Sequence, residues 1–65
     1  MKINSLETYR QCGERAGNAR RHKDEGVARW QTDWFNRTKM LETPEYRIQA
    51  EAAFRDGYKE GATTT

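Results

Sequence analysis

Apolar residues recur every three to four positions along most of the chain, which is the spacing of one face of an α-helix. Ser5 can cap a first helix, and Glu7 places negative charge in its first turn, where it suits the helix dipole. The pattern predicts a helix over residues 5–22. Its apolar side gathers Leu6, Tyr9, Cys12, Gly13, Ala16, Gly17 and Ala19.

A second helical pattern covers residues 25–42 and is wide on its apolar side. That side gathers Val27, Ala28, Trp30, Trp34, Phe35 and Leu41. The other side alternates in charge every four residues, which is typical of a solvated helix face. Its charged positions are Glu25, Arg29, Asp33 and Arg37.

The break between these two helices is predicted within residues 23–26. Gly26 can end the first helix, and Asp24 or Glu25 can begin the second. The alternative is one long helix that runs through Gly26, because a single glycine is only a moderate helix-breaking signal.

A sharper break follows, because Thr43 suits an N-cap and Pro44 suits the first position of a helix. We therefore predict a third helix over residues 44–60. Its apolar side gathers Tyr46, Ala50, Ala53, Phe54, Gly57, Tyr58 and Gly61. Glycines spaced by four on the first and third helices indicate close packing, which we expect to be against the indoles of the second helix.

These patterns predict an all-α fold, a single three-helix domain over residues 1–65 with frayed ends at 1–4 and 62–65. A domain of this size is only marginally stable alone and usually needs further stabilisation by a disulfide, a bound metal or a partner chain. Cys12 is the only cysteine, and Cys12 and His22 are the only soft ligands, so neither an internal disulfide nor a zinc site is expected. Formation of a homodimer is the remaining common way to stabilise such a small domain.

The composition is equally hydrophobic and charged, at 34% each, but the seven aromatic residues argue against disorder. No apolar run is long enough to span a membrane, and no signal peptide is recognisable. We therefore expect a cytoplasmic protein without a membrane partner. Residues 1–23 carry six basic and two acidic side chains (net +4), and residues 24–65 carry six basic and eight acidic ones (net −2).

Trp30, Trp34 and Phe35 form the largest apolar cluster, and we expect them to make the core, with one indole edge available to a partner. Met40 and Ile48 lie off the main stripes, on opposite sides of the Pro44 turn, and are candidates for a homodimer seam. The candidate partner-binding residues are Trp30, Trp34, Phe35, Met40 and Ile48.

The basic residues of the first helix offer an alternative, a phosphate-binding surface for nucleic acid. They are Arg10, Arg15, Arg20, Arg21 and Lys23. A solvated face with positive charge at a helix C-terminus is the preferred explanation, and no nucleic-acid-binding motif accompanies these residues. His22 is expected to be exposed, and Cys12 to be a small core residue, so no catalytic site, metal or cofactor is predicted.

The Trp30-x-x-x-Trp34-Phe35 stretch and the ending Phe54-Arg55-Asp56-Gly57-Tyr58-Lys59-Glu60-Gly61 resemble, in style, small helical accessory proteins of temperate, lambdoid-type bacteriophages. The resemblance implies a non-enzymatic protein that binds and modulates a host or viral component in the bacterial cytoplasm. It identifies neither the partner protein nor any functional residue.

Overall fold

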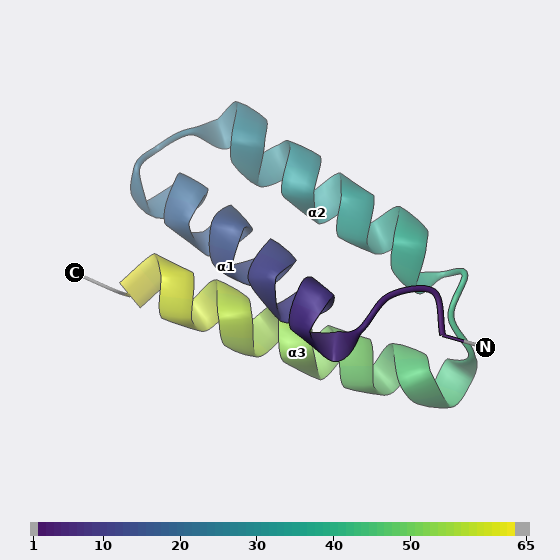
Figure 1. Cartoon of the computed structure of the whole chain (residues 1–65). Helices are drawn as coiled ribbons and strands as arrows, with labels where there is room; N and C mark the ends of the chain where they lie inside the picture. The colour runs from purple at the N-terminus through teal and green to yellow at the C-terminus, as the bar shows by residue number, and fades with distance from the viewer. Residues whose placement is uncertain (1, 64–65) are drawn as a thin grey trace.

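The computed structural model describes residues 2–63, which form three helices: α1 (Leu6–Arg21), α2 (Glu25–Lys39) and α3 (Pro44–Thr63). Figure 1 shows α1 between the other two helices, with α2 antiparallel to it and α3 parallel to it. Contacts between α2 and α3 are few, so α1 holds the domain together. The predicted all-α, three-helix fold is confirmed.

The N-terminus of each helix is capped by a side chain that the sequence predicts as a candidate cap. The Ser5 hydroxyl accepts a hydrogen bond from the Thr8 N–H at 3.1 Å. Asp24 accepts one from the N–H of Val27 at 3.2 Å. Before α3, the Thr43 hydroxyl accepts from the N–H of the third helical residue at 3.3 Å. These caps satisfy donors that have no partner inside a helix, so they define where each helix begins.

The break between α1 and α2 is real, but Gly26 does not make it. Lys23 has a φ of 60°, and its N–H donates to the carbonyl of Arg20 at 3.0 Å. The Asp24 N–H donates to the carbonyl of Ala19 at 2.7 Å. This pair of bonds is a Schellman motif with lysine in the left-handed position. Gly26 lies inside α2, so both the single-helix alternative and the assignment of Gly26 as a helix end are wrong.

The glycines of α1 and α3 let the two helix backbones touch. A Cβ atom on Gly13 would lie 2.0 Å from the carbonyl oxygen of Phe54, and one on Gly57 would lie 2.0 Å from that of Arg10. Gly17 and Gly61 repeat the arrangement one turn further along. Close approach is therefore confirmed, but the expected packing of the glycines against the indoles is wrong. The glycines face the opposite backbone instead.

The core is centred on Tyr9, which is fully buried. Its ring meets Phe35 edge to face, with centroids 5.6 Å apart, and also contacts Trp34 and Tyr46. Phe35 is buried as predicted, and Trp34 is half-buried at the margin of the core. Trp30 is 59% exposed, so its assignment to the core is wrong.

Geometry explains why Trp30 lies outside. The side of α2 that faces α1 carries the buried residues Ala28 and Phe35. At 100° per residue, Trp30 lies about 140–160° around the helix from both of them. The apolar face of α2 is therefore wider than the surface that α1 covers.

The chain ends are more ordered than the predicted frayed segments 1–4 and 62–65. The backbone N–H groups of Ile3 and Asn4 donate to the carboxylate of Glu42 at 2.9 and 3.0 Å. The Tyr46 hydroxyl donates to the carbonyl of Asn4 at 2.7 Å. Helix α3 continues through Thr63. Residues 1, 64 and 65 lie outside the described part of the chain.

Candidate functional site

One side of α2 presents an apolar stripe to solvent. Val27, Trp30 and Trp34 lie within about 60° of one another around the helix. Val27 is 43% exposed, Trp30 is 59% exposed and Trp34 is half-buried. We call these three residues the Trp30 surface.

A hollow of about 260 Å³ lies beside the Trp30 surface, between α2 and α1. It is lined by Thr8, Gln11, Cys12, Arg15, Trp30, Gln31 and Trp34. Its volume is below the roughly 300–1,000 Å³ of small-molecule pockets. A hollow of this size, lined by both indoles and by polar side chains, suits a side chain from another protein better than a cofactor.

Cys12 lines this hollow, but it is buried and is not placed to act as a nucleophile. Its Sγ atom donates to the backbone carbonyl of Gln31 at 3.2 Å and to the side-chain oxygen of Gln31 at 3.3 Å. Burial raises the pKa of the Cys12 thiol to about 11, although Arg15 acts in the opposite direction. The reactive thiolate is therefore scarce at neutral pH.

The charge ladder of α2 begins on the opposite side of the helix from the Trp30 surface and approaches it only at Asp33 and Arg37. All four of its side chains, Glu25, Arg29, Asp33 and Arg37, are exposed. Arg29 and Asp33 form an ion pair at 3.9 Å in which both side chains remain largely in solvent. Such a pair contributes little to stability, so these charges are available to a partner.

The other predicted partner-binding residues do not join this surface. Phe35 is buried and stacks on Phe54 with ring centroids 4.1 Å apart. Met40 is exposed after the end of α2. Ile48 is 69% exposed on α3, about 160° around that helix from its buried residues Tyr46 and Ala50. The five predicted residues therefore belong to four separate places.

A second hollow, of about 400 Å³, separates α2 from α3. Its lining residues are Phe35, Lys39, Glu51, Phe54, Arg55 and Tyr58. Lys39 and Glu51 form an ion pair across it at 3.0 Å, and the Lys39 ammonium lies 5.1 Å from the centroid of the Phe35 ring. The Lys39–Glu51 ion pair and the stacking of Phe35 on Phe54 link α2 to α3.

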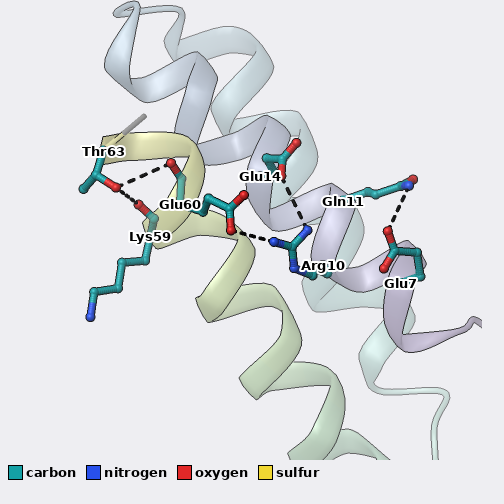
Figure 2. A network of polar contacts seen from close by, with 7 residues as sticks. All are labelled: Glu7, Arg10, Gln11, Glu14, Lys59, Glu60 and Thr63. Carbon is teal, nitrogen blue, oxygen red and sulfur yellow. Dashed lines mark hydrogen bonds and ion pairs between the residues drawn. The ribbon is translucent and has the colours of Figure 1, made fainter. Parts of the chain in front are cut away.

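Two of the five basic candidates for nucleic-acid binding are engaged within the domain. Arg10 forms ion pairs with Glu60 at 2.6 Å and with Glu14 at 3.6 Å (Figure 2). Arg21 donates to the carbonyl of Gly61 at 3.3 Å and to Asn18 at 3.0 Å. Both arginines therefore hold α1 to α3 or brace α1 itself.

The remaining basic candidates point in different directions. Arg15 lines the hollow beside Trp30, whereas Arg20 lines another hollow with Glu25 and Asp33. Lys23 is exposed in the turn after α1. Positions 10, 15 and 20 are separated by about 140° steps on a helix, so their side chains do not form one continuous basic face.

Glu42 is an important polar residue that the sequence patterns do not single out. It is 4% exposed and accepts hydrogen bonds from the Tyr9 hydroxyl and from the backbone N–H groups of Ile3 and Asn4. Burial acts to raise the pKa of Glu42, but these donors outweigh it and lower that pKa. No local sequence signal marks this role, because the partners are 33 or more residues away.

Over residues 2–63, no group of three or more histidine, cysteine, aspartate or glutamate side chains is placed to hold a metal ion. Within the same range, none of the helices combines the length and the apolar character needed to cross a membrane. Comparison with known proteins found no matching family model, no matching curated protein and no matching solved structure.

Proposed function

We propose that this chain is a small non-enzymatic protein that acts by binding another protein through the Trp30 surface. The observation that carries the proposal is the exposure of Trp30, at 59%, in a chain whose core is built mainly from tyrosine, alanine and one phenylalanine. Leaving an indole in water forgoes one of the largest hydrophobic gains that a side chain can make on burial.

The surroundings of Trp30 resemble the centre of a protein interface. Tryptophan is enriched among residues that dominate binding energy, and such residues sit within a polar rim that excludes water. Here Gln11, Arg15 and Gln31 form polar margins of the adjoining hollow. The helix beneath the stripe is capped at its start, so the indoles are held on a rigid element.

The non-enzymatic part of the proposal rests on His22 and Cys12, the two residues whose side chains are best suited to catalysis. His22 is the exposed C-cap of α1, outside every hollow described above. The Cys12 thiol is buried and hydrogen-bonded, and its pKa is raised to about 11. General acid–base or nucleophilic catalysis needs partnered groups in a pocket.

The biological setting in this proposal follows from the stylistic resemblance to temperate-phage accessory proteins. On that basis, the chain works in the cytoplasm of a bacterial host and modulates a host or viral protein by covering its surface. Nucleic-acid binding is the second candidate, because Arg15, Arg20 and Lys23 are exposed. It ranks lower since those side chains diverge around α1.

Photo-crosslinking in bacterial lysate tests the binding role directly. A benzophenone amino acid replaces Val27 on the Trp30 surface or, as the control, Ile48 on α3, which is also exposed. We expect a defined protein adduct only from position 27, reduced about tenfold or more when Trp30→Ala is added. Equal labelling from both positions, or no protein adduct, would contradict the proposal. A mobility shift of mixed DNA and RNA at low salt would instead support the second candidate.

A further inference from the structure

We infer that the partner segment that covers the Trp30 surface is acidic, with an apolar side chain that enters the hollow between α1 and α2 and carboxylates on both sides of that side chain. The inference rests on the proposed function, which assigns protein binding to the Trp30 surface, and it states the chemistry of the partner. It follows from the charges that border the surface.

Two arginines border the Trp30 surface on opposite sides. Arg15, on α1, lines the hollow together with both indoles. Arg37 lies one turn beyond Trp34 on α2, about 20° around the helix from Trp30 and on the side away from α1. Both arginines are exposed, and within residues 2–63 neither side chain takes part in an ion pair. The indoles therefore lie between two uncompensated positive charges.

The carboxylates nearest the Trp30 surface already have partners inside the domain. The pairs are Glu7 with the Gln11 amide, Glu14 with Arg10, Asp24 with the N–H of Val27, and Asp33 with Arg29. Asp33 and Arg29 also line a different hollow, together with Arg20 and Glu25. No carboxylate lines the hollow beside Trp30.

The charge of Arg15 acts inside this hollow. Burial raises the pKa of the Cys12 thiol to about 11, and Arg15 acts in the opposite direction. An apolar partner that covered Arg15 or Arg37 would remove water from a cation and supply nothing in its place, which is unfavourable. Carboxylates at these two points would remove that penalty, whereas cations would add repulsion.

The two arginines also set the spacing of the acidic groups. The hydrogen bond from the Cys12 Sγ atom to the carbonyl of Gln31 places these two residues at the same level of α1 and α2, which run antiparallel (Figure 1). Arg15 is therefore level with about residue 28, and Arg37 lies about 13 Å further along α2 at 1.5 Å per residue. A twelve-residue segment spans this distance in either a helical or an extended conformation.

A polypeptide suits this border better than a nucleic-acid strand. Nucleic-acid binding depends on the neutralisation of several phosphates by lysine and arginine, and this border offers two cations about 13 Å apart. Glu7 and Asp24 lie at the margins of the same surface, because they are bonded to Gln11 and Val27. A continuous row of phosphates would meet these carboxylates, whereas a short acidic segment places its charges only at the arginines.

Selection from a random twelve-residue peptide library on the immobilised chain tests the inference. The peptides to be analysed bind the wild type and are lost on Trp30→Ala. We expect them to combine a large apolar residue with at least two aspartates or glutamates. Basic or uncharged sequences would overturn the inference and leave protein binding at Trp30 standing. The absence of any Trp30-dependent peptide would remove both.

Charge variants test whether the two arginines make the contact. Binding of one selected peptide should weaken about three- to tenfold for Arg15→Gln and for Arg37→Gln, with slower association that depends less on salt. Arg55→Gln on α3 is the matched control, because Arg55 is also exposed and its loss changes the net charge equally. Equal effects of all three variants, or no effect of the first two, would overturn the inference.

Reversal of the charges tests direct pairing. Arg15→Glu with Arg37→Glu should bind the acidic peptide at least tenfold more weakly than the wild type does, and it should bind a copy of the peptide with lysines in place of its acids more tightly than the wild type does. A lysine peptide that prefers the wild type would overturn the inference. A mixed twelve-nucleotide single strand at equal concentration should not displace the acidic peptide from the wild type, and displacement would overturn the inference in favour of nucleic acid.

Discussion

The carbonyl oxygen of Phe54 in α3 lies 2.0 Å from the position that a Cβ atom of Gly13 in α1 would occupy. None of the five glycines in the chain has a positive φ, so turn geometry does not explain Gly13. Glycine in a helix costs roughly 1 kcal/mol relative to alanine. Direct backbone contact between α1 and α3 offsets that cost, because it lets the two longest helices pack without a layer of side chains.

Gly13→Ala and Gly57→Ala should each destabilise the domain by about 3 kcal/mol or more, because the new methyl group meets backbone atoms that cannot move aside cheaply. Gly26→Ala is the control. Its Cβ would meet only the Asp24 carboxylate, at 3.8 Å, so the change should stabilise α2 by about 0.5–1 kcal/mol. Urea denaturation followed by circular dichroism measures all three. Equal effects at the three positions would contradict the close packing of α1 and α3.

Lys23→Gly should stabilise the domain by about 1 kcal/mol. Lys23 occupies the left-handed region with a φ of 60°, where a side chain is disfavoured and glycine is not. Lys23→Ala keeps the Cβ atom and should give no such gain. The difference in urea midpoint between the two variants isolates the backbone effect, and a gain from alanine equal to that from glycine would show that the lysine side chain is responsible.

Acid should weaken the fold through Glu42. Its folded-state pKa is lowered below the ordinary 4.5, so its contribution to stability is full above about pH 4.5 and is lost as pH falls through the folded pKa. Glu42→Gln should lower the melting temperature at neutral pH and flatten its dependence on pH in the acid range. An unchanged acid slope in this variant would contradict the role assigned to the carboxylate.

Tyr9 and Cys12 should make the stability of the fold depend on pH in the alkaline range. Burial is the largest cause of the raised pKa of Tyr9, and it raises the pKa of Cys12 from 9.0 to about 11. Their contributions are present below the ordinary pKa values and are lost as pH rises through the folded ones. At pH 8 the native Cys12 should react with a disulfide reagent about 100-fold more slowly than in denaturant, because its thiolate is that much scarcer. Equal rates would place the thiol at the surface.

The helices could be predicted from the sequence because their signals are local. Ser5, Asp24 and Thr43 cap the helices that follow them, and the apolar spacing defines each helix to within three residues. The residue that forms the turn between α1 and α2 was harder to predict, because Lys23 takes a conformation that its residue type does not favour. Gly26 was the more obvious candidate and proved to be helical.

The core and the candidate site depended on long-range contacts that local pattern does not contain. Tyr9 and Glu42 are 33 residues apart, so nothing near either residue reveals their buried hydrogen bond. The prediction that Trp30 lies in the core failed for a related reason. Periodicity shows that Trp30 and Trp34 share a face of α2, but it does not show how much of that face α1 covers. Which apolar residues remain exposed is decided by the helix crossing.

The central claim, that the Trp30 surface is where this chain binds protein, is tested most directly by two-dimensional NMR of the labelled chain. Spectra of the free chain are compared with spectra recorded in the presence of the protein captured by the position-27 crosslink. We predict that the Trp30 indole N–H signal and the amides of Val27 and Trp34 shift on binding, while the methyl signals of Ile48 stay fixed. Shifts at Ile48 with no change at Trp30 would contradict the account.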